Sequence, residues 1–164
     1  MATEIERKFL VADVPSADEL GDGVPFRQGY LAGEGDVETR IRITPDVAWF
    51  TVKAGRSRAR VEVELPVDRD EAESLWPHTA GRRLEKVRYK VPVDGGVAEV
   101  DRYGGDLDGL WTVEVEFADE DAADAFAPPP WFGPEVTSTS GWSNGELARR
   151  GRPAEPPGGG PVAG

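Results

Sequence analysis

The sequence predicts a mainly β (α+β) fold, in which an antiparallel sheet carries a few short helices on its outside. Apolar and polar residues alternate with a period of two in seven segments of the chain, which is the pattern of strands with one buried face. Helical segments are fewer and shorter. The 20 glycines and 14 prolines gather between these segments and near the C-terminal end, where they indicate turns and loops.

The strands follow from the alternation. We expect them at residues 3–11, 37–44, 48–54, 60–66, 84–93, 97–103 and 110–117, with a short additional strand at 26–31. Loops are expected at 12–24, 33–36 and 104–109, where glycine, aspartate and proline interrupt the alternation.

Three short helices are predicted from the residues that begin them. Asp68 is a candidate N-cap for a helix that runs to about Trp76 and stops at the following proline. Asp119 begins a second helix that ends near residue 126. Ser143, with Glu146 three residues later, forms a capping box for the last helix.

The length of 164 residues predicts a single folded domain. We place this domain at residues 1–152. Residues 153–164 are rich in proline and glycine and offer almost nothing to bury, so we expect a disordered tail there.

Composition excludes several classes of function. A net charge of −12 would repel nucleic acid and anionic membranes, so neither is expected as a partner. The absence of cysteine excludes a thiol nucleophile, a disulfide scaffold and a cysteine-ligated zinc site. The single histidine, His78, excludes a multi-histidine metal site and is expected at the surface. A charged N-terminus and the lack of a long apolar run predict a cytoplasmic protein.

The charges on the strands are sorted by sign. Glu62-x-Glu64 and Glu114-x-Glu116 lie on two strands, Arg40-x-Arg42 and Lys86-x-Arg88 on two others. The ordinary arrangement has such charges in water around an apolar interior, but a face made only for solubility would mix signs within a strand. The alternative is a closed sheet with its charges inside. Its apolar outer face would then pack against the helices, the tryptophans at 76, 111 and 131 and Phe132, or a second subunit in a homodimer.

A charged interior of this kind suits one class of ligand. Two glutamates two residues apart on a strand place their carboxylates roughly 7 Å apart on one face, where they can share hard divalent cations. Arginine and lysine bind phosphate oxygens. Acidic and basic strands together therefore predict a site for a metal-bound polyphosphate.

The first strand contains Glu4-Ile5-Glu6-Arg7-Lys8, which resembles the Glu-x-Glu-x-Lys signature of the CYTH domain, also called the triphosphate tunnel metalloenzyme superfamily. Further motifs follow in the family's order: Gln28-Gly29-Tyr30-Leu31, Arg40-x-Arg42, Thr51-x-Lys53, Glu62-x-Glu64, Lys86-x-Arg88, Glu99-x-Asp101, Glu114-x-Glu116 and Ser143-Asn144. The resemblance covers residues 2–150. One departure is Gly141-Trp142, where small bacterial members often carry Arg-Tyr.

The resemblance implies a closed eight-stranded antiparallel β-barrel, the triphosphate tunnel, with Mg²⁺ or Mn²⁺ as cofactor. The implied metal ligands are Glu4, Glu6, Asp101, Glu114 and Glu116. The implied triphosphate-binding residues are Lys8, Arg40, Arg42, Lys53, Lys86 and Arg88. The implied catalytic residues are Glu4, Glu6, Lys8, Glu114 and Glu116. The resemblance leaves open the roles of Tyr30, Arg56, Arg58, Arg60, Glu62, Glu64, Arg149 and Arg150.

The family's repertoire leaves several activities to weigh. The compact length and the absence of a legible purine pocket favour hydrolysis of inorganic tripolyphosphate to diphosphate and phosphate. The alternatives are class IV adenylate cyclase activity, which converts ATP to cyclic AMP and diphosphate, and thiamine triphosphate hydrolysis. A fourth is a module that binds polyphosphate or nucleotide without turning it over. In each case the partner is a small molecule that contains a triphosphate.

Overall fold

The structure, a computed structural model, describes residues 3–56 and 58–154. In these residues nine strands form one antiparallel sheet: β1 (Thr3–Val11), β2 (Val24–Tyr30), β3 (Val37–Ile43), β4 (Ala48–Ala54), β5 (Ala59–Val67), β6 (Arg83–Val93), β7 (Gly96–Tyr103), β8 (Trp111–Phe117) and β9 (Phe132–Glu135). Of the predicted disordered tail, residues 155–164 lie outside the described residues.

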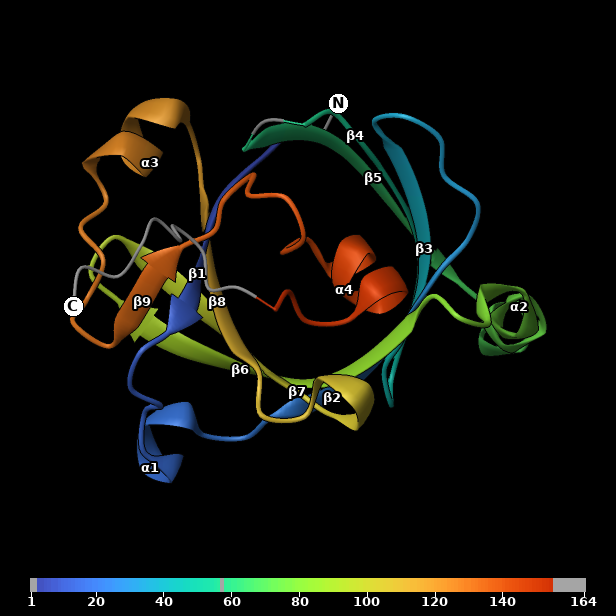
Figure 1. Ribbon diagram of the computed structural model, residues 1–164, viewed down its shortest axis with the longest axis horizontal. Helices are drawn as coiled ribbons and strands as arrows, with labels where there is room; N and C mark the ends of the chain where they lie inside the picture. The colour runs from blue at the N-terminus through green and yellow to red at the C-terminus, as the bar shows by residue number, and fades with distance from the viewer. Residues whose placement is uncertain (1–2, 57, 155–164) are drawn as a thin grey trace.

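The sheet closes on itself (Figure 1). Its strand order is β5-β4-β3-β2-β6-β7-β8-β1-β9, and an additional pairing joins β5 to β1. Eight strands therefore form a closed ring, as predicted, and β9 adds to the outside of the ring beside β1. The closing seam is short, because only Thr3, Glu4 and Ile5 pair with β5.

The helices are short, and the three predicted ones are present. They are α2 (Arg69–Leu75), α3 (Glu120–Ala125) and α4 (Asn144–Arg150). Asp68, Asp119 and Ser143 cap them with their side chains, as predicted. A 3-10 turn, η1 (Trp76–Thr79), continues α2, and a second, η2 (Gly105–Leu107), lies in an expected loop.

One α-helix and one strand were not predicted. The first is α1 (Ala17–Leu20), which lies in the segment expected to be a loop and carries a complete capping box from Ser16 and Glu19. The second is β9, which pairs with β1 only at Phe9↔Glu135 and Val11↔Phe132, across an irregular register. Four residues that include a glycine and a proline give no alternation to detect.

The outer apolar face of the ring is covered in two places. Near α3, Phe9, Phe117, Phe126 and Phe132 belong to one apolar cluster, with Trp111 and Trp131 packed against it. Near α2, Ile41 and Ile43 belong to another, with Trp76 against it. The three tryptophans thus pack on the outside, as predicted, and His78 is exposed.

Elsewhere the outer face is bare. Val61, Val63 and Leu65 on β5 keep 39%, 49% and 53% of their surface exposed, and the predicted homodimer stays a prediction. None of the helices in the described part of the chain is long and apolar enough to cross a membrane.

The last helix, α4, lies inside the ring (Figure 1). Its Leu147 and the preceding Trp142 pack with Tyr30, Tyr103 and Leu110 in a third apolar cluster. The chain therefore fills part of the ring with its own C-terminal segment, and the rest of the interior is open.

Candidate active site

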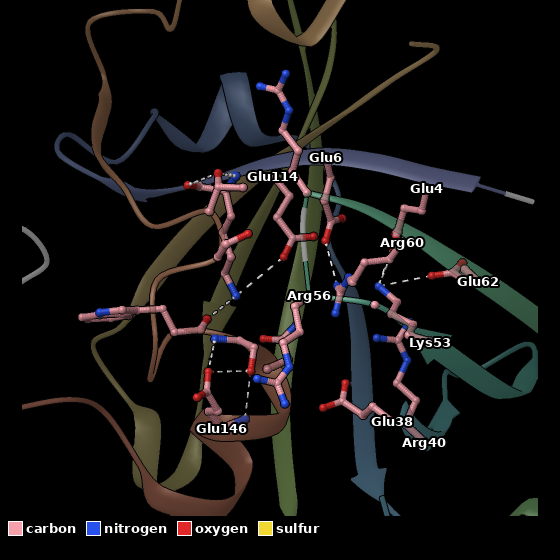
Figure 2. A pocket seen from close by; sticks show the side chains of 18 of the residues that line it. Glu4, Glu6, Glu38, Arg40, Lys53, Arg56, Arg60, Glu62, Glu114 and Glu146 are labelled. Carbon is pink, nitrogen blue, oxygen red and sulfur yellow. Dashed lines mark hydrogen bonds and ion pairs between the residues drawn. The ribbon is translucent and has the colours of Figure 1, made fainter. Parts of the chain in front are cut away.

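The ring encloses a charged cavity of about 840 Å³ (Figure 2). Its acidic lining from the strands comprises Glu4, Glu6, Glu38, Glu62, Glu64, Glu99, Glu114 and Glu116. Its basic lining from the strands comprises Lys8, Arg40, Arg42, Lys53, Arg60 and Arg88. The sorted charges therefore face inward, and the ordinary arrangement with charges in outside water does not apply to this ring.

The acidic side is built from β1, β7 and β8. Register places Glu6 opposite Glu116, and Glu99 opposite Glu114. Burial, together with the nearby carboxylates of Glu114 and Glu4, raises the pKa of Glu6 to about 7. Burial and the neighbouring glutamates also raise the pKa of Glu116. Repulsion among the carboxylates of this wall therefore favours the protonated forms of Glu6 and Glu116.

The basic side is built from β3 and β6. Burial and the neighbouring guanidiniums of Arg40 and Arg88 lower the pKa of Arg42 to about 10. Arg40 is 5% exposed, and within the described residues its Nε has no hydrogen-bond partner. Its Nη2 lies 3.8 Å from Glu64. A buried N–H without an acceptor is costly, so this wall is suited to receive an anion.

A separate set of ion pairs links β1, β4 and β5 (Figure 2). Lys53 Nζ lies 2.9 Å from Glu4 Oε2 and 3.2 Å from Glu62 Oε2. Arg60 Nη2 donates to Glu6 Oε1 at 3.2 Å. The cations and carboxylates of the cavity thus neutralise one another here, and both would be freed for a ligand that carries its own metal and anionic charge.

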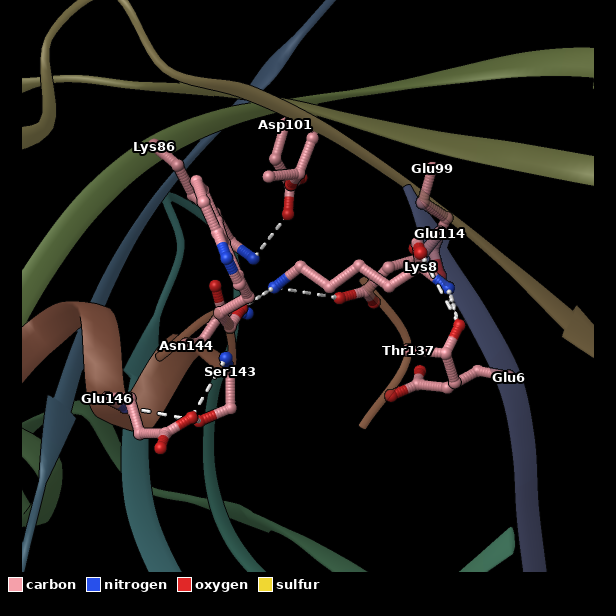
Figure 3. A network of polar contacts seen from close by, with 12 residues as sticks. Glu6, Lys8, Lys86, Glu99, Asp101, Glu114, Thr137, Ser143, Asn144 and Glu146 are labelled. Atoms are coloured by element: carbon pink, nitrogen blue, oxygen red, sulfur yellow. Dashed lines mark hydrogen bonds and ion pairs between the residues drawn. The ribbon is translucent and has the colours of Figure 1, made fainter. Parts of the chain in front are cut away.

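Lys8 is held by the C-terminal segment (Figure 3). Its Nζ donates to the carbonyl oxygen of Trp142 at 2.8 Å and lies 3.6 Å from Glu114 Oε1. Although burial alone would raise it, the pKa of Glu114 is lowered to about 2 by Lys8 and Arg88. At the position where small bacterial members of the resembled family often carry Arg-Tyr, this chain has Gly141-Trp142. Trp142 is buried, and its backbone carbonyl accepts from Lys8.

The start of helix α4 is fixed to the wall of the ring. Tyr103 Oη donates to Asn144 Oδ1 at 2.5 Å. Ser143 Oγ accepts from the backbone N–H of Glu146, whose carboxylate accepts from Ser143 in return (Figure 3). The expected capping role of Ser143 is thereby confirmed.

Two predicted site residues occupy inward positions but are buried and do not line the cavity. Lys86 Nζ donates to Asp101 Oδ2 at 2.6 Å (Figure 3), and Arg88 donates to both oxygens of Asp101 at 2.8 and 2.9 Å. The side chains of Lys86 and Asp101 are 0% and 1% exposed, and neither lines the cavity. Both oxygens of Asp101 are thus occupied by cations, an arrangement unlike the expected contact with a metal.

Three further arginines that line the cavity pair with acidic side chains. Arg58 pairs with Glu120 and Asp124 of α3, each at 2.5 Å. Arg56 pairs with Asp36. Arg149 of α4 lies 3.6 Å from Glu38 and stacks over the Tyr30 ring at 5.4 Å, while Arg150 lines the cavity. Tyr30 is fully buried, and burial raises the pKa of its hydroxyl.

Sequence reasoning assigned no site role to several residues that line the cavity. Glu38 and Glu99 are in phase with Arg40 and Asp101 along their strands, so the alternation itself was the available signal. The lining segment from Val136 to Asn144 carries no comparable pattern. Its place inside the ring depends on packing between residues far apart in the chain.

The donor set fits a hard divalent cation in its chemistry. Carboxylate oxygens are the preferred ligands of Mg²⁺ and similar ions, and the raised pKa of Glu6 reports crowding that a cation would relieve. In the described residues, no three histidine or acidic side chains are already arranged to hold an ion. The carboxylates would have to exchange their lysine and arginine partners for the metal.

Comparison with known proteins agrees with this geometry. No family model matches the sequence. The chain is 50% identical to an inorganic triphosphatase of Nitrosomonas europaea, over 89% of this chain and 97% of the relative. It is 37% identical to an inorganic triphosphatase of Acetivibrio thermocellus, over 91% and 95%. A crystal structure of an inorganic triphosphatase matches with a TM-score of 0.66 at 46% identity, over 89% of this chain and 97% of that one.

Proposed function

Because the chain belongs to the inorganic triphosphatase family, within the CYTH or triphosphate tunnel metalloenzyme superfamily, we propose that it hydrolyses inorganic tripolyphosphate to diphosphate and phosphate. The observation that carries the proposal is the cavity with an acidic and a basic side in one ring of strands. A metal-bound triphosphate carries both kinds of charge, and it can replace the internal ion pairs on both sides at once.

The basic side binds the phosphate oxygens. Arg40 offers a buried N–H that lacks an acceptor, and Arg42 and Arg88 stand beside it in the wall. Lys8 donates one N–H to the Trp142 carbonyl, which leaves the rest of its ammonium group for the substrate. Guanidinium forks and an ammonium group at fixed positions would align the triphosphate and stabilise charge as the terminal phosphoryl group departs.

The acidic side would hold Mg²⁺ or Mn²⁺. Glu4, Glu6, Glu114 and Glu116 are the residues we assign to this role. When bound, the metal would neutralise phosphoryl oxygens and make a coordinated water more acidic. We assign Asp101 a different role, because its buried carboxylate holds Lys86 and Arg88 in place.

The lining favours an inorganic substrate. Its two aromatic residues, Tyr30 and Trp142, are 0% and 3% exposed and pack within the α4 cluster. Neither presents a free face on which the ring of a nucleotide or of thiamine could stack. A substrate that consists of phosphates alone needs no such face.

The test is release of phosphate by the purified protein from tripolyphosphate, ATP and thiamine triphosphate, with Mg²⁺ or Mn²⁺ and with a chelator as control. We expect release from tripolyphosphate that requires metal, with diphosphate as the second product and little reaction of the other two. Cyclic AMP and diphosphate from ATP would assign the protein to the cyclases instead. Tight binding of tripolyphosphate without turnover would make it a binding module.

A further inference from the structure

One aromatic ring contacts three cations at the basic side of the ring of strands. Phe26 lies on β2, opposite Lys86 of β6. The guanidinium carbons of Arg42 and Arg88 lie 5.0 and 5.2 Å from the centre of its ring, and Lys86 Nζ lies 5.6 Å from it. All three distances are within the range of cation–π attraction.

Carboxylates hold two of these cations, Lys86 and Arg88, much more closely than the third, Arg42. Asp101 serves both Lys86 and Arg88, and Glu99 lies 2.9 Å from Arg88. The Glu64 carboxylate lies 3.9 Å from Arg42, whose Nε also donates to Gln28 Oε1 at 3.0 Å. Arg42 is therefore the cation with the weakest carboxylate contact, and the Phe26 ring adds an attraction that it shares with the neighbouring Arg88 guanidinium.

A carboxylate at this position would supply that attraction, but it would also repel a phosphate that approaches Arg42 and Arg88. The face of an aromatic ring attracts cations through its quadrupole and carries no net charge. A phenylalanine can therefore gather the cations and still leave their positive charge available to an anion.

We propose that Phe26 is a positioning residue for triphosphate binding, which holds the Arg42 and Arg88 guanidiniums toward the cavity through its ring face. The proposal rests on the proposed function. Phe26 does not itself line the cavity. It acts through two residues that do.

The test compares kcat and KM for tripolyphosphate in the wild type, Phe26→Leu and Phe26→Tyr. Leucine keeps an apolar side chain but has no ring face, whereas tyrosine keeps the ring. We expect Phe26→Leu to raise KM about tenfold, in line with the loss of desolvated cation–π contacts, with kcat changed by less than about twofold. Phe26→Tyr should restore KM to within about twofold of the wild type.

The chain offers a matched control. The Trp76 ring holds Arg27 and Arg83, each at 4.8 Å, on the outside of the ring of strands. Trp76→Leu removes a comparable aromatic contact with two arginines, so it should lower the melting temperature and leave KM unchanged. A rise in KM as large as that of Phe26→Leu would mean that general loosening, and not the Phe26 ring, explains the effect.

Three further outcomes would overturn the proposal. Wild-type KM in Phe26→Leu would show that the ring face has no part in binding. Equal damage from leucine and tyrosine would assign the effect to packing shape. A wild type that neither hydrolyses tripolyphosphate nor is stabilised by it against heat would overturn the proposed function first, and this proposal with it.

Discussion

At the scale of single residues, the surroundings of a carboxylate decide what it does. Asp101 and Glu116 are both acidic and both face the interior side of their strands. Asp101 is fully buried between Lys86 and Arg88, whereas Glu116 lines the open cavity among other glutamates. Asp101 therefore stabilises the fold. Glu116 is repelled by the neighbouring carboxylates, and a bound metal would reduce that repulsion.

We expect Asp101→Asn to destabilise the metal-free protein. Removing one partner of a buried ion pair leaves uncompensated charge and costs about 3–5 kcal/mol, here on Lys86 and Arg88 together. Urea unfolding in the presence of a chelator measures the loss, with exposed Asp106→Asn as the control. Unchanged stability of Asp101→Asn would show that the Asp101 carboxylate does not hold the two cations.

Glu6 predicts a pH dependence of stability. Its pKa is about 7 in the fold against an ordinary value of 4.5, so the folded protein holds this proton more tightly than the unfolded chain. The contribution is present below pH 4.5 and is lost as the pH rises through 7, by up to about 3 kcal/mol. Glu114 affects stability in a different pH range. Its pKa is lowered to about 2, so its stabilising contribution is lost only as the pH falls from 4.5 toward 2.

Glu6→Gln should therefore flatten the stability of the metal-free protein between pH 5 and pH 8, and make it more stable than the wild type at pH 8. Thermal melts over this range measure the slope, and the exposed Glu34→Gln should keep the wild-type slope. A Glu6→Gln protein that still loses stability as steeply as the wild type would refute the assignment.

At the scale of elements, α4 connects folding to the site. The helix and the segment before it lie inside the ring, and the Trp142 carbonyl there holds Lys8. The Ser143–Glu146 capping box sets where the helix begins. The same kind of capping box, from Ser16 and Glu19, begins α1 on the outside of the ring.

These two caps make a matched pair. Ser143→Ala and Ser16→Ala should each cost about 1 kcal/mol of stability. Only Ser143→Ala should also lower kcat/KM for tripolyphosphate, because it disturbs the segment that holds Lys8. Both kcat/KM and the urea midpoint are measured for each variant. Equal kcat/KM in the two variants would show that the start of α4 does not affect the site.

The elements also show how far the sequence could be read. Alternation located eight strands to within a few residues, and Asp68, Asp119 and Ser143 marked three helices correctly. The same alternation could not place α4 inside the ring, because that depends on Trp142 and Leu147 meeting Tyr30 and Tyr103 across the chain. Nor could it separate Asp101 from the lining glutamates, since all of them occupy inward positions.

At the scale of the whole molecule, closure of the sheet creates the site. Eight strands bring motifs from residue 4 to residue 116 around one cavity. In that cavity the positive side can bind an anion although the chain as a whole carries a net charge of −12. Binding should therefore need a metal to reduce repulsion from the acidic side, and excess chelator should abolish turnover.

The most direct test of the central claim is the initial rate of phosphate release from tripolyphosphate with saturating Mg²⁺ or Mn²⁺, for the wild type, Glu4→Gln and Arg40→Ala. We predict that Glu4→Gln lowers kcat by more than about a hundredfold and that Arg40→Ala raises KM by about tenfold. The exposed Arg102→Ala, outside the cavity, should match the wild type. Full activity in Glu4→Gln together with an unchanged KM in Arg40→Ala would contradict catalysis inside the ring.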